Sequence, residues 1–367
     1  MSAITTTTTH ATTASSAEAA PGVISLRWII GARDDLVWII GSVASSYLLF
    51  ALYVGGVVPL LPMVALWAIL IDAPHVFATL SRTYFDREER RARKRLLLGS
   101  LLFFAVGPVM VLSGAGFVFF FLAALWAYYH LVKQHYGFMV LYKKKNGDLA
   151  RTDNALDRAL IATGFWFPFV AFVARDPEAM ARVPAGLHSG LWYAEKLLLA
   201  ATVGVGLAWL ARQVQRAVRR EPLDVPKYLL LAAALPMHWV VLLTPMPHKP
   251  VAIVAILTIY HNFQYHRLVW FHNRKYAGRE DARERHGAAE LISRRLVYYV
   301  FFGLIFGLWY QGPRQYLNWT TDLNNFDLKT QVFSSFLWGY AFIHYYLDSK
   351  IWRVRRDPSV GRALKME

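Results

Sequence analysis

The sequence lacks cysteine entirely, and acidic residues are scarce relative to basic ones. Its 367 residues include 24 Asp and Glu against 40 Lys and Arg, which gives a formal net charge of +16 at pH 7. The absence of cysteine excludes disulfide bonds, thiolate nucleophiles and metal centres with cysteine ligands. In a chain with long apolar segments, the positive charge indicates basic loops that face anionic membrane lipids, so we expect no nucleic-acid partner.

Charged residues are also missing from long stretches, and these stretches are strongly apolar. Hydrophobic residues make up 56% of the chain. A bilayer core requires about 20 consecutive apolar residues per helix. We therefore expect an all-α, polytopic membrane helix bundle of about ten transmembrane helices. The expected spans are Leu36–Val58, Leu60–Ser81, Leu96–Leu112, Phe117–Leu141, Ala159–Ala174, Leu191–Ala211, Tyr228–Leu243, Val251–Phe271, Leu296–Tyr310 and Val332–Ile351.

The expected domain organisation is one transmembrane domain, residues 26–353, between two tails. The chain begins with a tract rich in Thr, Ser and Ala, which is too polar to form a core, so residues 1–25 are expected to be disordered. This tract also lacks the basic, apolar and small-residue order of a signal peptide. Residues 354–367 are expected to form a basic cytoplasmic tail.

The distribution of Lys and Arg predicts the orientation of the chain. With alternating spans, 32 of these residues fall on one side of the membrane and only 6 on the other. Basic residues collect in cytoplasmic loops. We therefore predict that both termini are cytoplasmic, in a multi-pass protein of the cell's inner membrane, and that the even-numbered spans run from outside to inside.

Polar residues inside the spans are concentrated on spans two, four, eight and ten. Ionisable groups are costly in a bilayer and usually have a function. In each of these spans the polar group lies in the predicted cytoplasmic half, so residues far apart in sequence lie at one depth. The residues are Asp72, His75, His130, Gln134, His135, His261, Asn262, Gln264, His266, His344 and Asp348.

Two of these spans place a histidine and a carboxylate on one helix face. Asp72 and His75 are three residues apart, and His344 and Asp348 are four apart. Residues at these spacings are neighbours on a helix surface. Each pair suits either two metal ligands or one ligand with a carboxylate that orients it. The second pair could equally be a structural hydrogen bond.

The other two spans carry histidine pairs with a less direct geometry. His130 and His135, like His261 and His266, are five residues apart, which is about 140° on an ideal helix. Either one histidine of each pair binds a metal while the other turns elsewhere, or a π-bulge brings both onto one face. Both interpretations remain open from the spacing.

Imidazole and carboxylate groups without sulfur suit non-haem iron, as one or two ions, with zinc or manganese as alternatives. Redox chemistry on an apolar substrate would favour iron. The candidate metal ligands are His75, His130, His135, His261, His266 and His344, and the candidate catalytic residues are Asp72, Gln134 and Asp348.

The remaining histidines have simpler explanations. Those in or beside a basic loop are expected to be solvated, and one in the outer half of a span is expected to be structural. Three others lie in the tail or in outer loops and are excluded as ligands. The histidines expected to be solvated are His272 and His286, and the structural one is His238. The excluded ones are His10 in the tail and His188 and His248 in outer loops.

The motifs resemble those of a known family. In order, they are Asp72-Ala-Pro-His75, Tyr129-His130, the segment from Tyr260 through His261 to His266, and His344-Tyr-Tyr-Leu-Asp348. This order is similar to the Brp/Blh family of membrane β-carotene 15,15′-dioxygenases. The resemblance implies a histidine-ligated non-haem iron and O₂-dependent cleavage of a carotenoid. It also implies four iron ligands: His75, His130, His261 and His266. His344 and Asp348 would either bind the iron as well or orient its ligands.

The leading hypothesis is therefore a membrane oxygenase, desaturase or dioxygenase that acts on a carotenoid or another hydrophobic lipid. Its electron donor is not identifiable from the sequence. Fatty-acid desaturases and alkane hydroxylases are a weaker comparison, because their adjacent His-His pair is absent from this chain. Two alternatives remain: a proton-coupled transporter that uses intramembrane His and Asp, and a metal-independent lipid transferase with a histidine base.

Overall fold

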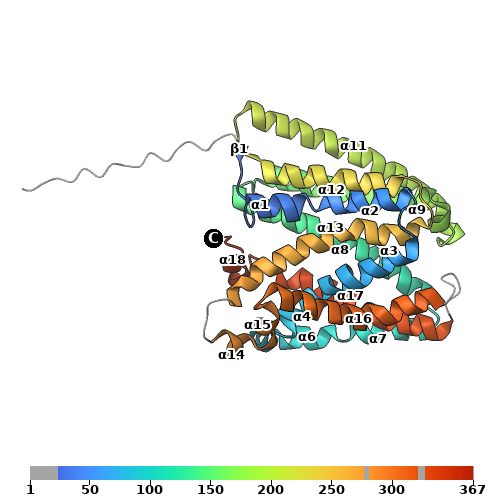
Figure 1. The fold of residues 1–367 in the computed structure, drawn as a ribbon. Coiled ribbons are helices and arrows are strands. Elements are labelled where there is room, and N and C mark those ends of the chain that lie inside the picture. Colours follow the sequence, from blue (N-terminus) through green and yellow to red (C-terminus); the bar gives the residue numbers. More distant parts are fainter. Residues whose placement is uncertain (1–23, 277–280, 321–326, 367) are drawn as a thin grey trace, which may run out of the picture.

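The computed structural model describes residues 24–276, 281–320 and 327–366, and these residues are almost entirely helical (Figure 1). Within these described ranges, eight segments are long and apolar enough to cross a membrane. They are Ala32–Val54, Leu60–Thr83, Lys94–Leu112, Gly116–Asn146, Arg151–Arg175, Ala185–Val218, Val225–Leu243 and Leu296–Leu317. The all-α membrane-type bundle expected from the sequence is thereby confirmed.

The helices that build the bundle run along a common direction in Figure 1. They are α2 (Val43–Val54), α3 (Leu60–Trp67), α4 (Ala73–Thr83), α6 (Lys94–Ser100), α7 (Phe103–Leu112), α8 (Gly116–Asn146), α9 (Arg151–Arg175), α11 (His188–Val218), α12 (Val225–Leu243), α13 (Lys249–His272), α16 (Leu296–Thr320) and α17 (Leu328–Ile351).

The shorter elements lie mostly at the ends of the bundle. They are α1 (Ala32–Asp34), α5 (Arg87–Ala92), α10 (Pro177–Met180), α14 (Ala282–His286), α15 (Ala288–Ser293), α18 (Pro358–Ala363), two π-helical segments, Asp35–Ile40 and Ala68–Asp72, the 3₁₀ turns Ala185–Leu187 and Asn273–Tyr276, and strands β1 (Ile24–Ser25) and β2 (Leu223–Asp224).

Helices α13 and α17 correspond to the expected spans eight and ten. Each has 24 residues, which is long enough to cross a bilayer core. Neither is among the eight sufficiently apolar segments, because polar side chains such as His261, Asn262, His344 and Asp348 lower their hydropathy. A total of ten spans therefore stays a prediction that depends on these two helices.

Some expected boundaries differ from the structure. Helix α16 continues to Thr320, whereas the sequence predicted a span that ends at Tyr310 and a long loop after it. Most of the segment expected to be disordered, residues 1–25, lies outside the described residues. Its last two residues form β1, which pairs in parallel with β2.

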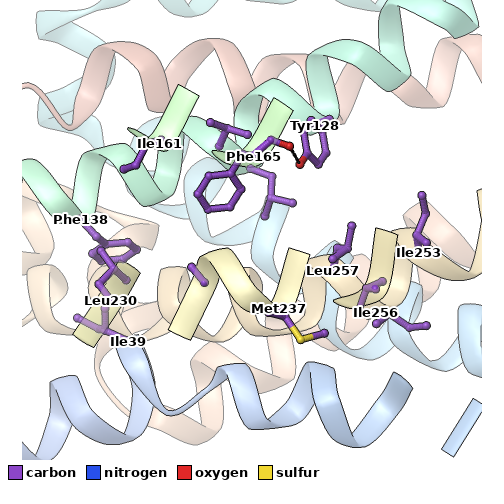
Figure 2. Close-up of a cluster of buried hydrophobic side chains, with 14 of the residues drawn as sticks. Ile39, Tyr128, Phe138, Ile161, Phe165, Leu230, Met237, Ile253, Ile256 and Leu257 are labelled. Atoms are coloured by element: carbon purple, nitrogen blue, oxygen red, sulfur yellow. Dashed lines mark hydrogen bonds between the residues drawn. The ribbon is translucent and has the colours of Figure 1, made fainter. Parts of the chain in front are cut away.

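Helix α13 lies at the centre of the bundle. It packs against α2, α3, α4, α8 and α12, whereas α11 lies at one edge and packs mainly on α9 (Figure 1). Figure 2 shows part of the largest apolar cluster, where Phe165 and Ile161 of α9 face Leu230 and Met237 of α12. The central position of α13 explains why most of its polar side chains are buried.

Close backbone contacts fix the helices that flank this centre. A Cβ atom on Gly307 of α16 would lie 2.0 Å from the carbonyl oxygen of Ile69. A Cβ atom on Gly107 of α7 would lie 2.5 Å from the carbonyl oxygen of Ser335 in α17. Small residues of this kind let membrane helices approach closely. These two close contacts fix the position of the segment before α4 and of helix α17.

A change of helical register precedes α4. Pro74 lies in its first turn and has no backbone N–H, so the carbonyl of Leu70 cannot receive the usual α-helical hydrogen bond. The chain is π-helical over Ala68–Asp72, directly before this point. Such π segments are frequent at functional sites because they redirect side chains.

The predicted basic loops lie together at one end of the bundle. Asn146 contacts Arg27, Arg93 forms an ion pair with Asp357, and Asp86 bridges to Gly287. These contacts connect the segments that follow α4, α8 and α13 with both ends of the described chain. The structure thus groups the segments that the charge count assigned to one side.

Candidate metal centre

Four buried histidines from four helices meet in the interior. They are His75 of α4, His130 of α8, His261 of α13 and His344 of α17. One ring nitrogen of each lies within 4.8 Å of the others. These are the four helices on which the sequence placed the polar residues, so the expected convergence of distant segments is confirmed.

Two of the nitrogen–nitrogen distances match those around a single metal ion. The Nε2 atoms of His75 and His344 are 2.8 Å apart, and those of His344 and His130 are 3.1 Å apart. Metal–nitrogen bonds of about 2.0–2.1 Å place two ligand nitrogens about 2.9–3.4 Å apart. A neutral imidazole has only one N–H to donate, and the Nε2 atom of His344 has two nitrogen neighbours. A shared cation would satisfy these lone pairs together.

Hydrogen bonds on the outer side of His344 assign its tautomer. Thr79 and Tyr265 donate to the same carboxylate oxygen of Asp348, at 2.9 and 2.6 Å. Because the hydroxyl proton of Thr79 is used in this bond, its oxygen accepts from Nδ1 of His344, 2.7 Å away. The Nδ1 atom therefore carries the proton, and Nε2 presents a lone pair to the group of four. Metal-binding histidines are commonly oriented in this way.

The direct pair of His344 and Asp348 has a different geometry from the one expected. Their closest nitrogen and oxygen atoms are 3.8 Å apart, which is too far for a hydrogen bond. Thr79 bridges them. The carboxylate thus orients the imidazole through a hydroxyl group.

Aromatic rings enclose the histidines. The ring of Tyr265 packs edge-on against His75, with centroids 4.6 Å apart. The ring of Tyr345 stacks on His130 at 4.4 Å. All four histidines are at most 8% exposed. This packing fixes the rings and keeps bulk water away from them.

Asp72 and Gln134, two of the catalytic candidates, lie beside the group but outside it. Asp72 accepts a hydrogen bond of 3.3 Å from Asn262. The amide of Gln134 donates to the backbone carbonyl of His261 at 2.9 Å. Both therefore contact the segment of α13 that carries His261, and neither is in the four-histidine group.

The second histidine of each pair spaced five residues apart is also outside the group. The Nδ1 atom of His135 lies 2.8 Å from the carbonyl of Leu131, one turn earlier. The Nδ1 atom of His266 lies 2.9 Å from the hydroxyl of Tyr299. Helices α8 and α13 are regular through these positions, and the π segment lies before α4 instead. The geometry thus favours one ligand from each pair over a bulge that unites them.

Three histidines outside the candidate set are also buried. His238 lies 3.2 and 3.0 Å from the hydroxyls of Tyr128 and Tyr260, as expected for a structural residue. His272 and His286 were expected to be solvated, and this prediction was wrong: they are 1% and 4% exposed. The ring of His272 packs against Trp352, and Nδ1 of His286 lies 3.1 Å from a carboxylate oxygen of Asp86.

Thr79 and Tyr265 were not identified from the sequence. Each lies four residues after a histidine of the group, His75 and His261 respectively, and so shares its helix face. That spacing is the signal that could have found them. Thr and Tyr are ordinary in membrane helices, so their hydroxyl groups alone do not indicate a site.

Comparisons with protein-family models, with curated proteins and with solved structures found no match to this chain. What the chain does must therefore be inferred from its own residues. The described residues form a membrane-type helical bundle with a buried histidine cluster that could bind a metal ion.

Proposed function

We propose that this protein is an integral membrane metalloenzyme in which His75, His130, His261 and His344 hold one non-haem iron ion. We further propose that it is an O₂-dependent oxygenase or dioxygenase acting on a lipid or a carotenoid. The observation that carries this proposal is the convergence of four buried imidazoles from four apolar helices on a volume that suits one ion. The β-carotene cleavage implied by the Brp/Blh resemblance is one form of it.

The donor set supports a redox metal more than a purely structural one. The ligands are imidazoles without sulfur, which suit iron, and zinc or manganese could also bind. A bound iron ion would supply the redox chemistry that O₂ requires before it reacts with an unactivated carbon. A site enclosed by apolar helices supports a hydrophobic substrate, which can enter laterally from the bilayer.

The residues of the chain have separate tasks in this proposal. The four imidazoles present lone pairs, and Thr79 with Asp348 fixes the tautomer of one of them. Tyr265 holds a hydroxyl proton beside Asp348, 2.6 Å from the carboxylate. The rings of Tyr265 and Tyr345 exclude water from the histidines.

Metal analysis of the protein purified without chelators tests the proposal. We expect about one equivalent of iron, and loss of most of it in His75→Ala and His261→Ala. His248→Asn is the matched control, because His248 is an exposed outer histidine with a left-handed backbone that Asn tolerates. Oxygen uptake by the iron-loaded protein is then measured with β-carotene and with unsaturated lipids.

Two results would contradict the proposal, and a third would favour an alternative. Metal content below about a tenth of an equivalent, unchanged in the histidine variants, would remove the metal centre. Proton flux in liposomes by such metal-free protein would favour the transporter instead. A metal-loaded protein that consumes no O₂ with any lipid would support the metal centre but contradict the oxygenase activity.

A further inference from the structure

Arg82 is a fully buried arginine whose guanidinium forms no hydrogen bond with the described residues. Its side chain has 0% exposure. None of its three guanidinium nitrogens has a hydrogen-bond partner among the described residues. A guanidinium group carries five N–H donors and stays protonated in proteins. Buried charges are normally paired because an unpaired one is strongly unfavourable, so a buried guanidinium without hydrogen bonds is a candidate binding group.

A second buried donor or acceptor lies close to Arg82. The guanidinium stacks on the ring of Trp352 at 4.0 Å, and the ring of His272 packs edge-on against the same indole, with centroids 5.5 Å apart. The Nε2 atom of His272 is also buried without a hydrogen-bond partner among the described residues. Two unsatisfied nitrogen-bearing groups therefore flank one tryptophan.

Lys275 adds positive charge to the same place. It follows His272 by three residues. Burial and the positive charge of Arg82 lower the pKa of Lys275, although Asp86, Glu89 and Glu88 oppose this change. The Nζ atom of Lys275 is 4.0 Å from Asp86. Lys275 is thus a second basic group within electrostatic reach of Arg82.

The acidic residues of this region are engaged elsewhere. Asp86 caps α5 by accepting from the backbone N–H of Glu88, and it contacts Tyr276 and His286. Asp348 accepts hydrogen bonds from Thr79 and Tyr265. Glu89 and Glu88 form ion pairs with Arg93 and Arg285. Although Asp348 is within electrostatic reach of Arg82, none of these carboxylates forms a hydrogen bond with its guanidinium among the described residues.

We propose that Arg82, His272 and Lys275 form a binding site for an oxyanion, the carboxylate or phosphate headgroup of an acidic lipid. Such groups accept two parallel hydrogen bonds from a guanidinium and match its planar geometry. A lipid is a better source than a soluble anion, because Arg82 lies in the last turns of a segment apolar enough to cross a membrane. The same binding would satisfy the buried nitrogens.

This site also narrows the substrate of the proposed enzyme, and in this respect it depends on the function proposed above. Arg82 follows His75 by seven residues on α4, which is about two turns and roughly 10 Å along the helix axis, on nearly the same face. A lipid held by its headgroup at Arg82 would place a carbon of its chain beside the four histidines. The substrate class is then an acidic amphiphile, and of the forms of the activity proposed above this excludes cleavage of β-carotene, a neutral hydrocarbon.

The experiment measures thermal unfolding of the delipidated, metal-free protein in a non-ionic detergent. Four additives are compared: a long-chain fatty acid, phosphatidic acid, diacylglycerol and inorganic phosphate. We expect the two acidic lipids to raise the unfolding midpoint of the wild type, and the neutral lipid and inorganic phosphate to leave it unchanged. In Arg82→Gln the apparent affinity for the acidic lipids should fall roughly tenfold to a hundredfold.

Arg294→Gln is the matched control. It removes one positive charge at the same end of the bundle, but from an arginine already paired with Glu290. It should bind the acidic lipids like the wild type. Arg82→Lys keeps the charge but not the fork of donors, so it should retain part of the affinity for the acidic lipids. It is the variant to measure if Arg82→Gln does not fold.

Three results would overturn the proposal. Equal stabilisation by acidic lipids in the wild type, Arg82→Gln and Arg82→Lys would exclude Arg82 as the binding group. Equal stabilisation by diacylglycerol would show that the headgroup is irrelevant, and full stabilisation by inorganic phosphate would exclude a lipid. Because the readout uses metal-free protein, these failures are separate from failure of the metal centre, which iron content reports.

Discussion

Nδ1 of His344 lies 2.7 Å from Oγ1 of Thr79, although the two residues are 265 positions apart in the sequence. This contact joins α17 to α4 next to the group of four histidines. It also leaves Nε2 of His344 as a lone pair directed at His75 and His130. A single hydroxyl group therefore couples the packing of two helices to the tautomer of a candidate ligand.

Replacement of Thr79 by valine tests this relationship. Valine keeps the branched shape but cannot accept from His344 or donate to Asp348, so the imidazole loses its fixed tautomer. We expect metal affinity to fall roughly 10- to 100-fold, as for other residues that orient metal ligands. Competition with a chromogenic chelator measures the change.

Thr83→Val is the control for this substitution. Thr83 lies one turn later on α4, is fully buried, and bonds only to the backbone carbonyls of its own helix. It should retain wild-type metal affinity. The tautomer argument fails if both variants lose affinity equally, or if Thr79→Val loses none.

The histidine pairs on α8 and α13 allow a direct comparison within each helix. The structure includes His130 and His261 in the group of four and leaves out His135 and His266. We expect His130→Ala and His261→Ala to lose most of the bound metal and His135→Ala and His266→Ala to keep it. The metal content of the four purified variants tests this expectation. Loss of metal from His135→Ala or His266→Ala would indicate a larger centre.

The acidic residue Asp224 gives a pH-dependent prediction outside the spans. Burial raises the pKa of Asp224 to about 6, from an ordinary value of 3.8, and the hydrogen bond and charge of Lys227 oppose this only in part. The folded state thus holds a proton more tightly than the unfolded state. Stability should therefore fall as pH rises from about 4 to about 6, and the loss should persist above that range.

Asp224→Asn removes this penalty and keeps the cap that the side chain gives to the backbone N–H of Lys227. We expect the variant to be more stable than the wild type at pH 8, by about 1–3 kcal/mol, and equally stable near pH 4. Thermal unfolding in detergent at the two pH values measures this. A variant less stable than the wild type at pH 8 would contradict it.

Asp148 provides the comparison with the opposite sign. Burial would raise the pKa of Asp148, but the charges of Lys227, Lys143 and Arg216 outweigh burial and lower it. Its contribution is present at neutral pH and is lost as pH falls through the lowered value. Asp148→Asn should therefore destabilise the protein at pH 8, whereas Asp224→Asn stabilises it.

The orientation of the chain can be tested with reporter fusions. The positive-inside rule predicts a cytoplasmic C-terminus and an external 3₁₀ turn at Ala185–Leu187. A fluorescent protein fused after the last residue should fold and fluoresce, and alkaline phosphatase inserted at Gly186 should be active. The reverse pattern would invert the predicted topology and move the histidine group to the outer half.

The sequence by itself determined the class of the fold and the helices that carry the site. Apolar length and the scarcity of charge identify membrane helices because a bilayer core tolerates little else. The same intolerance made the polar residues of spans two, four, eight and ten conspicuous. Periodicity along each helix then paired His344 with Asp348, because neighbours on a helix face are a local property.

Only the tertiary structure decided which polar residues meet. The pairs His130 and His135, or His261 and His266, are equivalent in spacing, and their choice depends on how α8 and α13 are rotated about their axes. That rotation is set by packing against many helices at once, such as the close contact at Gly307. Thr79 and the unpartnered Arg82 became visible for the same reason: bonding and burial belong to the assembled bundle and not to any one segment.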